Sequence, residues 1–254
     1  MISVRAWEWF LKNQIRIFIS SLLVAYLLPC SAQLNQQSAP DSQTDLLNLT
    51  ERFYGSDDML ISGSVYVPSS PLISHHPYFD REEWQEGIVF IDGRRFDAQQ
   101  IRYDLPARKM ILNAVLKEGA TVKIALNAWK IDSLYLGDHL FINSNNLSLP
   151  ESDTSFYELI HRNGFIFITG YHKEFIHKYT ASSPYGLWSS QTASHFIYTD
   201  QWYPVTSKRS LLTWFPSGKD EIRKYMHVNR IRFRKATSDQ LKPLLVRCGE
   251  YYQH

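Results

Sequence analysis

Short apolar stretches that alternate with polar residues, separated by turn residues, limit the possible folds of this chain more than any other feature. The clearest stretch covers residues 120–128, where every second residue is apolar: Val122, Ile124, Leu126 and Ala128. A period of two predicts an antiparallel strand with one buried face. Because several such stretches follow one another, we expect a meander of strands that forms a sandwich or a partial barrel.

Turn signals place the other expected strands. The strongest is Asp92-Gly93, which predicts a tight hairpin between two alternating stretches. Two later hairpins are expected, one around Gly170 and one around Asp200-Gln201. Residues 68–86 are expected to form a long loop. The expected strands, in chain order, are 59–67, 87–91, 95–103, 109–115, 120–128, 165–169, 174–179, 195–198 and 202–205.

The chain ends in patterns typical of short helices. Ser207 is placed to cap a helix over 208–215. Ser217 and Asp220 have the spacing of a capping box for the next helix, which Asn229 can end. The fold class that follows is α+β, with a mainly antiparallel β body and a short helical C-terminal region.

Two further elements are expected after Asn229. Residues 230–234 alternate arginine with apolar residues, which predicts a short strand with one arginine face. Thr237 and Gln240 indicate a cap for a last helix, although Pro243 favours a start a few residues later. The apolar face of this helix consists of Leu241, Leu244, Leu245, Cys248 and Tyr252.

Length and composition exclude several classes of protein. A chain of 254 residues can bury a core without disulfides or metals. With 44% hydrophobic and 20% charged residues, it is not disordered, collagen-like, a coiled coil or a multi-span membrane protein as a whole. We expect a β body over 59–206 and a basic helical region over 207–254 that packs on it.

Residues 1–32 have the parts of a secretory signal. Three basic residues precede an apolar run over 17–28, and small residues follow it. We expect cleavage after Ala32, which leaves a loose polar leader over 33–58. An uncleaved anchor is one alternative, although the run is short for a bilayer span. A lipoprotein signal with Cys30 is another, although Pro29 stands where such signals have Gly, Ala or Ser.

Charge is unevenly distributed along the expected mature chain. Residues 33–206 carry 13 basic and 20 acidic side chains, whereas residues 207–254 carry 11 basic and 4 acidic ones. Either the two parts attract each other or the basic end contacts an anionic partner. One cysteine, Cys248, remains after cleavage, and we expect it to be a buried, inert thiol rather than a nucleophile.

Several short motifs together resemble a known family. They are Gly93 with Phe96, Tyr103 and Asp104, then residues 156–158, 202–205, 207–212, 223–225, 244–245 and 251–252. In this combination the chain resembles a family of exported, uncharacterised proteins common in Bacteroidetes, over about 60–254 and most strongly from 195 on. The Ala32-Gln33 exit is similar to signal peptides of that group. The resemblance implies export and an envelope setting, in the periplasm or on the outer-membrane surface, and implies no activity.

Sequence motifs of known chemistry are absent, namely GxSxG, HExxH, CxxC, GxGxxG and the P-loop. His75-His76 with Asp80 is the densest group of possible metal ligands. A metal site needs three or four ligands in a fixed geometry, which the sequence does not establish here, so a solvated loop explains the group better. His172 with His177, and Asp132 with Asp138, are weaker candidates. The aromatic residues Trp202, Tyr203 and Trp214 favour core packing over a sugar platform. We therefore assign no catalytic residue, cofactor or metal site.

The basic C-terminal region holds the one candidate binding site. Its residues are Arg223, Lys224, Arg230, Arg232, Arg234 and Lys235. A row of guanidinium groups suits carboxylates or phosphates, which arginine binds bidentately. The alternatives are that the charges protect an edge strand from aggregation or neutralise the acidic body.

These observations favour a non-catalytic envelope protein that binds or scaffolds a partner, either an envelope protein or an anionic envelope surface. Nucleic acid is disfavoured because the chain is expected to be exported. The oligomeric state is open. The alternative is a hydrolase that acts on an envelope polymer or glycan. A concave pocket with paired carboxylates, or with a histidine beside a nucleophile, would favour the hydrolase.

Overall fold

The computed structural model describes residues 56–68, 72–116, 119–149 and 154–252, all within one compact unit, Asp41–His254. The expected signal and most of the expected leader lie outside the described residues. The strands are β1 (Ser64–Val65), β2 (Gln85–Ile91), β3 (Arg94–Asp104), β4 (Lys109–Val115), β5 (Thr121–Ala125), β6 (Ile131–Leu136), β7 (His139–Asn143), β8 (Phe156–His161), β9 (Ile166–His172), β10 (Phe175–Ile176), β11 (Leu187–Trp188), β12 (Thr192–Tyr198) and β13 (Trp202–Pro204). The helices are α3 (Lys208–Thr213), α4 (Lys219–Val228) and α5 (Ser238–Gly249).

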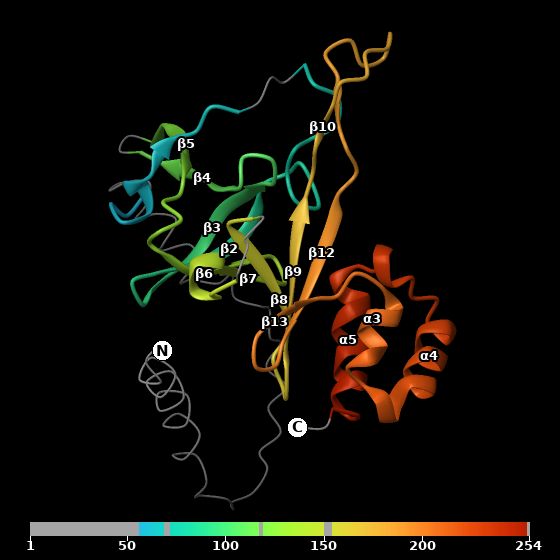
Figure 1. Cartoon of the computed structure of the whole chain (residues 1–254). Helices are drawn as coiled ribbons and strands as arrows, with labels where there is room; N and C mark the ends of the chain where they lie inside the picture. Colours follow the sequence, from blue (N-terminus) through green and yellow to red (C-terminus); the bar gives the residue numbers. More distant parts are fainter. Residues whose placement is uncertain (1–55, 69–71, 117–118, 150–153, 253–254) are drawn as a thin grey trace, which may run out of the picture. The chain divides into compact units, whose positions relative to one another are not determined.

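One antiparallel sheet dominates the described part of the chain (Figure 1). Its eleven strands follow the order β1-β5-β4-β3-β2-β6-β7-β8-β9-β12-β13, and β10 and β11 form a separate two-stranded ribbon. β1 and β13 stand at opposite ends of this order, so the sheet is open rather than closed into a barrel. The predicted class, a mainly antiparallel β protein with a short helical C-terminal region, is confirmed.

The hairpin predicted at Asp92-Gly93 is confirmed. Both residues have positive φ, 48° and 76°, and connect β2 directly to β3. A two-residue turn of this kind needs positive φ at both positions, which Asp-Gly tolerates well. The predicted hairpin around Asp200-Gln201 is confirmed as well, because β12 pairs with β13 across it.

The hairpin predicted around Gly170 is wrong. β9 runs through Gly170 without a turn and pairs with β8 on one side and β12 on the other. A side chain at Gly170 would place its Cβ 2.8 Å from the ring of Tyr157. Glycine therefore serves close packing here, not a turn. The segment expected to return beside β9 instead holds β10, which pairs with β11.

A hairpin that the sequence analysis did not predict joins the two halves of the sheet. β6 and β7 pair across Gly137-Asp138, and β6 also pairs with β2. The expected strand at 59–67 is mostly replaced by a 3-10 helix over Leu60–Ser62, followed by the two-residue β1. The strand at 109–115 has the predicted bounds.

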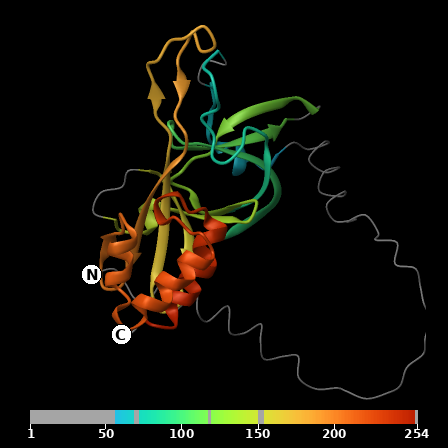
Figure 2. The same cartoon turned by 90° about the vertical axis from the view of Figure 1, so that its right-hand side faces the viewer.

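The described unit has three apolar clusters, of which two are large. The first lies on β2–β8 and contains Tyr103, Phe141 and Phe156, all fully buried. The second lies between β8, β9 and β12 and the three helices. Figures 1 and 2 show these helices, in red and orange, over one face of those strands. The basic C-terminal region thus packs on the sheet through an apolar interface.

The helix caps differ from the sequence predictions in two places. Ser207 caps α3 as predicted, with its side chain accepting a hydrogen bond from the amide of Ser210. Ser217 does not cap α4, whose first turn follows Gly218; its hydroxyl donates to the carbonyl of Tyr251. α5 begins at Ser238 despite Pro243, so the later start that we expected is wrong.

The strand predicted over 230–234 is wrong. Arg230 has φ of 53° and ends α4 in a left-handed turn, in which the Ile231 amide donates to the Met226 carbonyl at 2.8 Å. Ile231 and Met226 are both buried, which is typical of this helix ending. A 3-10 helix over Phe233–Lys235 follows. The extended backbone that would align three arginines in one row is therefore absent.

Candidate functional site

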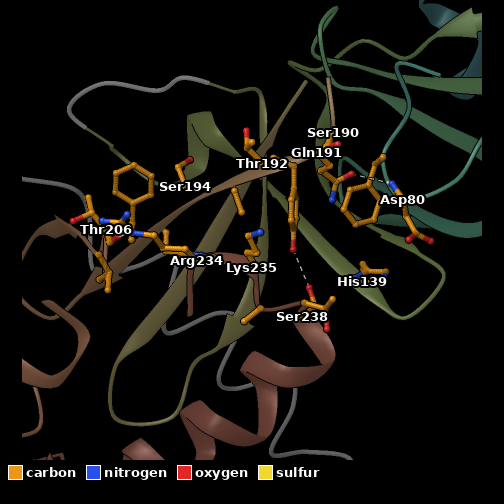
Figure 3. A pocket seen from close by; sticks show the side chains of 18 of the residues that line it. Asp80, His139, Ser190, Gln191, Thr192, Ser194, Thr206, Arg234, Lys235 and Ser238 are labelled. Carbon is orange, nitrogen blue, oxygen red and sulfur yellow. Dashed lines mark hydrogen bonds between the residues drawn. The ribbon is translucent and has the colours of Figure 1, made fainter. Parts of the chain in front are cut away.

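A cavity of about 820 Å³ lies where the sheet meets the segment that leads into α5 (Figure 3). Its walls come from residues 79–80, His139 on β7, Tyr171 on β9, residues 190–196, 204–206 and 234–238. This volume is within the range of small-molecule sites in proteins. Two of the predicted site residues, Arg234 and Lys235, lie on its wall.

Strand register places a group of polar side chains beside this cavity. Phe141 of β7 pairs with Glu158 of β8, and Glu158 pairs with Thr169 of β9. Residues two apart on a strand share a face. His139, two residues before Phe141, and Tyr171, two residues after Thr169, therefore stand on the same face as Glu158.

The Glu158 carboxylate is the centre of this group. It has no exposed surface, and its Oε1 lies 2.8 Å from Nδ1 of His139. The Tyr171 hydroxyl donates to Oε2 at 2.5 Å, and the Ser238 hydroxyl donates to the same oxygen. A buried carboxylate needs such partners, because an unpaired charge in the interior is costly. The network also ties the first residue of α5 to the sheet.

His139 is held by Glu158 in a defined orientation. A carboxylate accepts hydrogen bonds, so Nδ1 of His139 carries a proton and donates a hydrogen bond to Glu158. The other ring nitrogen, Nε2, is left for a different partner. The hydrogen bond to Glu158 raises the pKa of His139, although partial burial opposes this shift. Its side chain remains 22% exposed and lines the cavity.

The arrangement offers hydrogen-bond donors rather than a nucleophile. The Ser238 hydroxyl is bonded to Glu158 and Tyr171, not to a histidine. Burial and the nearby Glu158 charge raise the pKa of the Tyr171 hydroxyl, so it stays protonated. Ser194 on the cavity wall lies 2.9 Å from Nε2 of His172, which is not itself part of the wall, and Asp80 is the only carboxylate among the described residues that line the cavity. Binding of a ligand is the chemistry that these groups support best.

The predicted basic residues are only partly brought together. Arg234 donates from Nε to the carbonyl of Thr206 at 3.3 Å, and Figure 3 shows the two residues side by side. The ammonium group of Lys235 has no partner among the described residues. Arg223 forms an ion pair with Asp220 at 2.8 Å within α4. Lys224, Arg230 and Arg232 are exposed and do not line the cavity.

The weaker metal and carboxylate candidates do not converge. His75 has positive φ in a loop, and His76 lies 3.4 Å from Nζ of Lys173. Asp132 accepts a hydrogen bond from the amide of Gly93, whereas Asp138 lies beyond the other end of β6. No group of three possible metal ligands occurs among the residues that the structure describes.

The remaining candidates serve packing. His172 contacts Ser194 at 2.9 Å, while His177 contacts Tyr179 outside the main sheet. Trp202 donates to the carbonyl of Leu147. The rings of Tyr203 and Trp214 pack at a tilt, with centroids 4.8 Å apart, against the second apolar cluster. Cys248 is fully buried, as predicted, and burial raises the pKa of its thiol to about 12.

The sequence analysis missed His139, Glu158, Tyr171 and Ser238. One available signal was Glu158 itself, a charged residue in the otherwise apolar stretch 156–160. A charge at such a position is rarely left without a partner. Its partners, however, come from three other elements, and nothing in the local sequence names them.

No family model, curated protein or solved structure matches this chain. In the described ranges, none of the helices has the length and apolar character needed to cross a membrane.

Proposed function

We propose that this chain is an exported envelope protein that binds an anionic partner through its basic C-terminal region and catalyses no reaction. The observation that carries the proposal is the lack of internal neutralisation of that region. Its basic residues up to position 235 are Lys208, Arg209, Lys219, Arg223, Lys224, Arg230, Arg232, Arg234 and Lys235.

Ion pairs among the described residues leave almost all of these basic side chains without a carboxylate partner. Of the nine, only Arg223 forms an ion pair with a carboxylate in the described residues, and its partner belongs to the same helix. All except Lys219 are exposed. The acidic residues of the body that the structure describes therefore do not neutralise them by contact, which supports an external anionic partner over an internal one. Such a surface attracts anionic groups over roughly 8 Å at physiological salt.

Vesicles test the proposal. The mature chain should bind vesicles of anionic phospholipid, or lipopolysaccharide, more tightly than vesicles of neutral phospholipid, and the binding should weaken steeply with salt. Each basic residue near an anionic membrane contributes about 1 kcal/mol. The triple variant Lys224→Gln, Arg230→Gln, Arg232→Gln should therefore lose about 3 kcal/mol, or roughly 100-fold in affinity.

A matched control removes three cations from the body, with Arg108→Gln, Lys109→Gln and Lys123→Gln. These residues are exposed on or near β4 and β5, and the control should bind almost as the parent does. Unchanged vesicle binding by the C-terminal variant, together with a lower melting temperature, would show that these charges act within the chain and would overturn the proposal.

Export is tested separately by intact mass. We expect the protein isolated from the cell envelope to begin at Gln33 and to carry no lipid. A retained leader, or a lipid adduct on Cys30, would contradict the expected cleavage after Ala32.

The hydrolase alternative has two observations in its favour, namely the His139–Glu158 pair beside a cavity and the contact between Ser194 on the cavity wall and His172. A histidine held by a carboxylate can act as a general base. Incubation of the mature chain with peptidoglycan and envelope polysaccharides tests this alternative. Products that disappear in His139→Gln would favour it.

A further inference from the structure

We propose that the cavity beside His139 binds a small ligand that carries a carboxylate or phosphate group on an apolar body. Lys235 and His139 are its anion contacts. Lys235 also belongs to the basic region of the proposed function, but the three residues changed in the vesicle test do not line this cavity, so the inference is tested independently of that function.

When its ring is protonated, His139 is a preorganised donor to a ligand through Nε2. Its Nδ1 is occupied by Glu158, which fixes the ring, and its Nε2 has no partner among the described residues. Glu158 is in turn held by Tyr171 and Ser238. A donor whose orientation is fixed by buried hydrogen bonds binds a ligand without paying the full ordering entropy. A fully buried carboxylate thus holds a partly exposed histidine at the cavity wall.

Lys235 is the second contact. It belongs to the 3-10 helix over Phe233–Lys235, which is anchored because Phe233 is buried with its ring centroid 5.0 Å from that of His195. Lys235 lines the cavity, and Figure 3 shows it between Arg234 and Ser238. A free ammonium group on a fixed turn is well placed to bind a carboxylate or phosphate.

The negative groups near the cavity do not cancel these donors. Glu158 has no exposed surface and accepts three hydrogen bonds. Asp80 is paired with Arg81 at 2.9 Å. The net charge presented to a ligand is therefore positive whenever His139 is protonated.

The rest of the wall suits an apolar body. It includes Phe79, Phe196, Pro204 and Val205, together with the ring of Tyr171. Aromatic walls with a few polar groups at one side are typical of sites for small organic ligands. An anion with an aromatic or branched aliphatic body satisfies both parts of the cavity.

Protonation of His139 couples ligand affinity to pH. The charged groups that act on its ring are Glu158 from β8, Asp80 from the loop before β2 and Lys242 from α5, and the titratable groups Tyr171 and Lys235 line the same cavity. The carboxylates favour the charged ring and Lys242 opposes it. The hydrogen bond to Glu158 dominates, so anion binding should be stronger at pH 6 than at pH 8.5.

Calorimetry with four small probes tests the proposal on the mature chain. Benzoate and phenyl phosphate represent the two anionic groups, and phenol and benzylamine are the neutral and cationic controls. We expect at least one anion to bind with a dissociation constant below about 10 mM, more tightly at pH 6. The stronger of the two anions identifies the natural head group. Failure of both anions to bind, or equal binding of phenol, would overturn the proposal.

Variants assign the contacts. Lys235→Gln should weaken binding about tenfold, as expected for one charged hydrogen bond, whereas Lys224→Gln, on the exposed face of α4, should not. His139→Gln should remove the pH dependence.

Because that change could disturb Glu158, an NMR titration of the unmodified protein provides a second measurement. Bound anion should raise the pKa of His139 and leave that of exposed His227 unchanged; equal behaviour of the two histidines would contradict the assignment. Retained vesicle binding by Lys235→Gln would separate this site from the proposed surface function.

Discussion

His139 and His195 lie on the same face of the sheet, but their surroundings shift their pKa in opposite directions. His139 has a carboxylate partner, which favours the charged ring. His195 is buried, with its Nδ1 2.9 Å from the Thr169 hydroxyl and the rings of Phe167 and Phe233 nearby. Burial lowers the pKa of His195 from 6.5 to about 4. The buried histidine is thus neutral at physiological pH.

This shift makes the fold sensitive to acid at His195. A histidine with a lowered pKa contributes its full stability above the unfolded value of 6.5 and loses it as the pH falls toward 4. The free energy of unfolding should therefore fall over this range by about 3 kcal/mol from this residue. In His195→Gln the fall should be smaller. Chemical denaturation at pH 7.5, 6, 5 and 4 measures it, and identical slopes for the two proteins would contradict the shift.

Cys248 gives a second prediction at the scale of a single residue. The thiol is fully buried on α5 with its pKa raised to about 12, so it is neither accessible nor ionised. A thiol reagent should label it only after denaturant is added. Cys248→Ser should cost on the order of 1 kcal/mol or more, because a hydroxyl is buried in place of a thiol. Rapid labelling of the folded protein would contradict the buried position.

At the scale of elements, two serines with similar sequence contexts have different roles. Ser207 accepts a hydrogen bond from the Ser210 amide at the start of α3. Ser217 has the spacing of a capping box but donates to a carbonyl instead. Ser207→Ala should therefore lower the free energy of unfolding by about 1 kcal/mol. Ser217→Ala should cost clearly less. Thermal unfolding of both variants measures the two losses of stability. Equal losses would show that the Ser207 cap does not stabilise α3.

Local chemistry made some elements predictable. The turn at 92–93 requires positive φ at both residues, which Asp-Gly tolerates better than most pairs. Residues 109–115 are a short, mostly apolar stretch bounded by turn residues on both sides. Both predictions hold because the signal and the structure depend on the same few residues.

Other elements were mispredicted because one pattern fits two structures. Ile231 and Phe233 are buried, and their arginine neighbours are exposed, as a strand requires. A left-handed helix ending followed by a 3-10 helix produces the same alternation. Gly170 was wrongly predicted to be a turn residue. A glycine is needed there because the ring of Tyr157 packs against it, and Tyr157 lies on another strand.

At the scale of the molecule, the candidate site was beyond local prediction. Of the six basic residues proposed from the sequence, Arg234 and Lys235 reach the cavity. The residues that make the cavity polar, His139 and Glu158, come from strands whose pairing is set by the sheet order. Charge composition could indicate a basic surface, but it could not indicate a buried carboxylate network.

The helical region should not unfold separately from the sheet. Its apolar face and the strands β8, β9 and β12 form one cluster, and Ser238 bonds to Glu158 in the sheet. We therefore expect a single cooperative transition for the mature chain. Urea curves followed by far-ultraviolet circular dichroism and by tryptophan fluorescence should coincide. An early transition confined to the helical signal would contradict this coupling.

The strand order also affects how fast the chain can fold. Seven of the ten pairings in the described sheet join strands that are neighbours in sequence, so most contacts close short loops with little loss of entropy. Folding rates rise as contacts become more local, and this sheet should fold faster than a Greek-key sandwich of similar size. The β2–β6 pairing is the main exception. During synthesis, one edge of β2 therefore stays unpaired until β6 has left the ribosome.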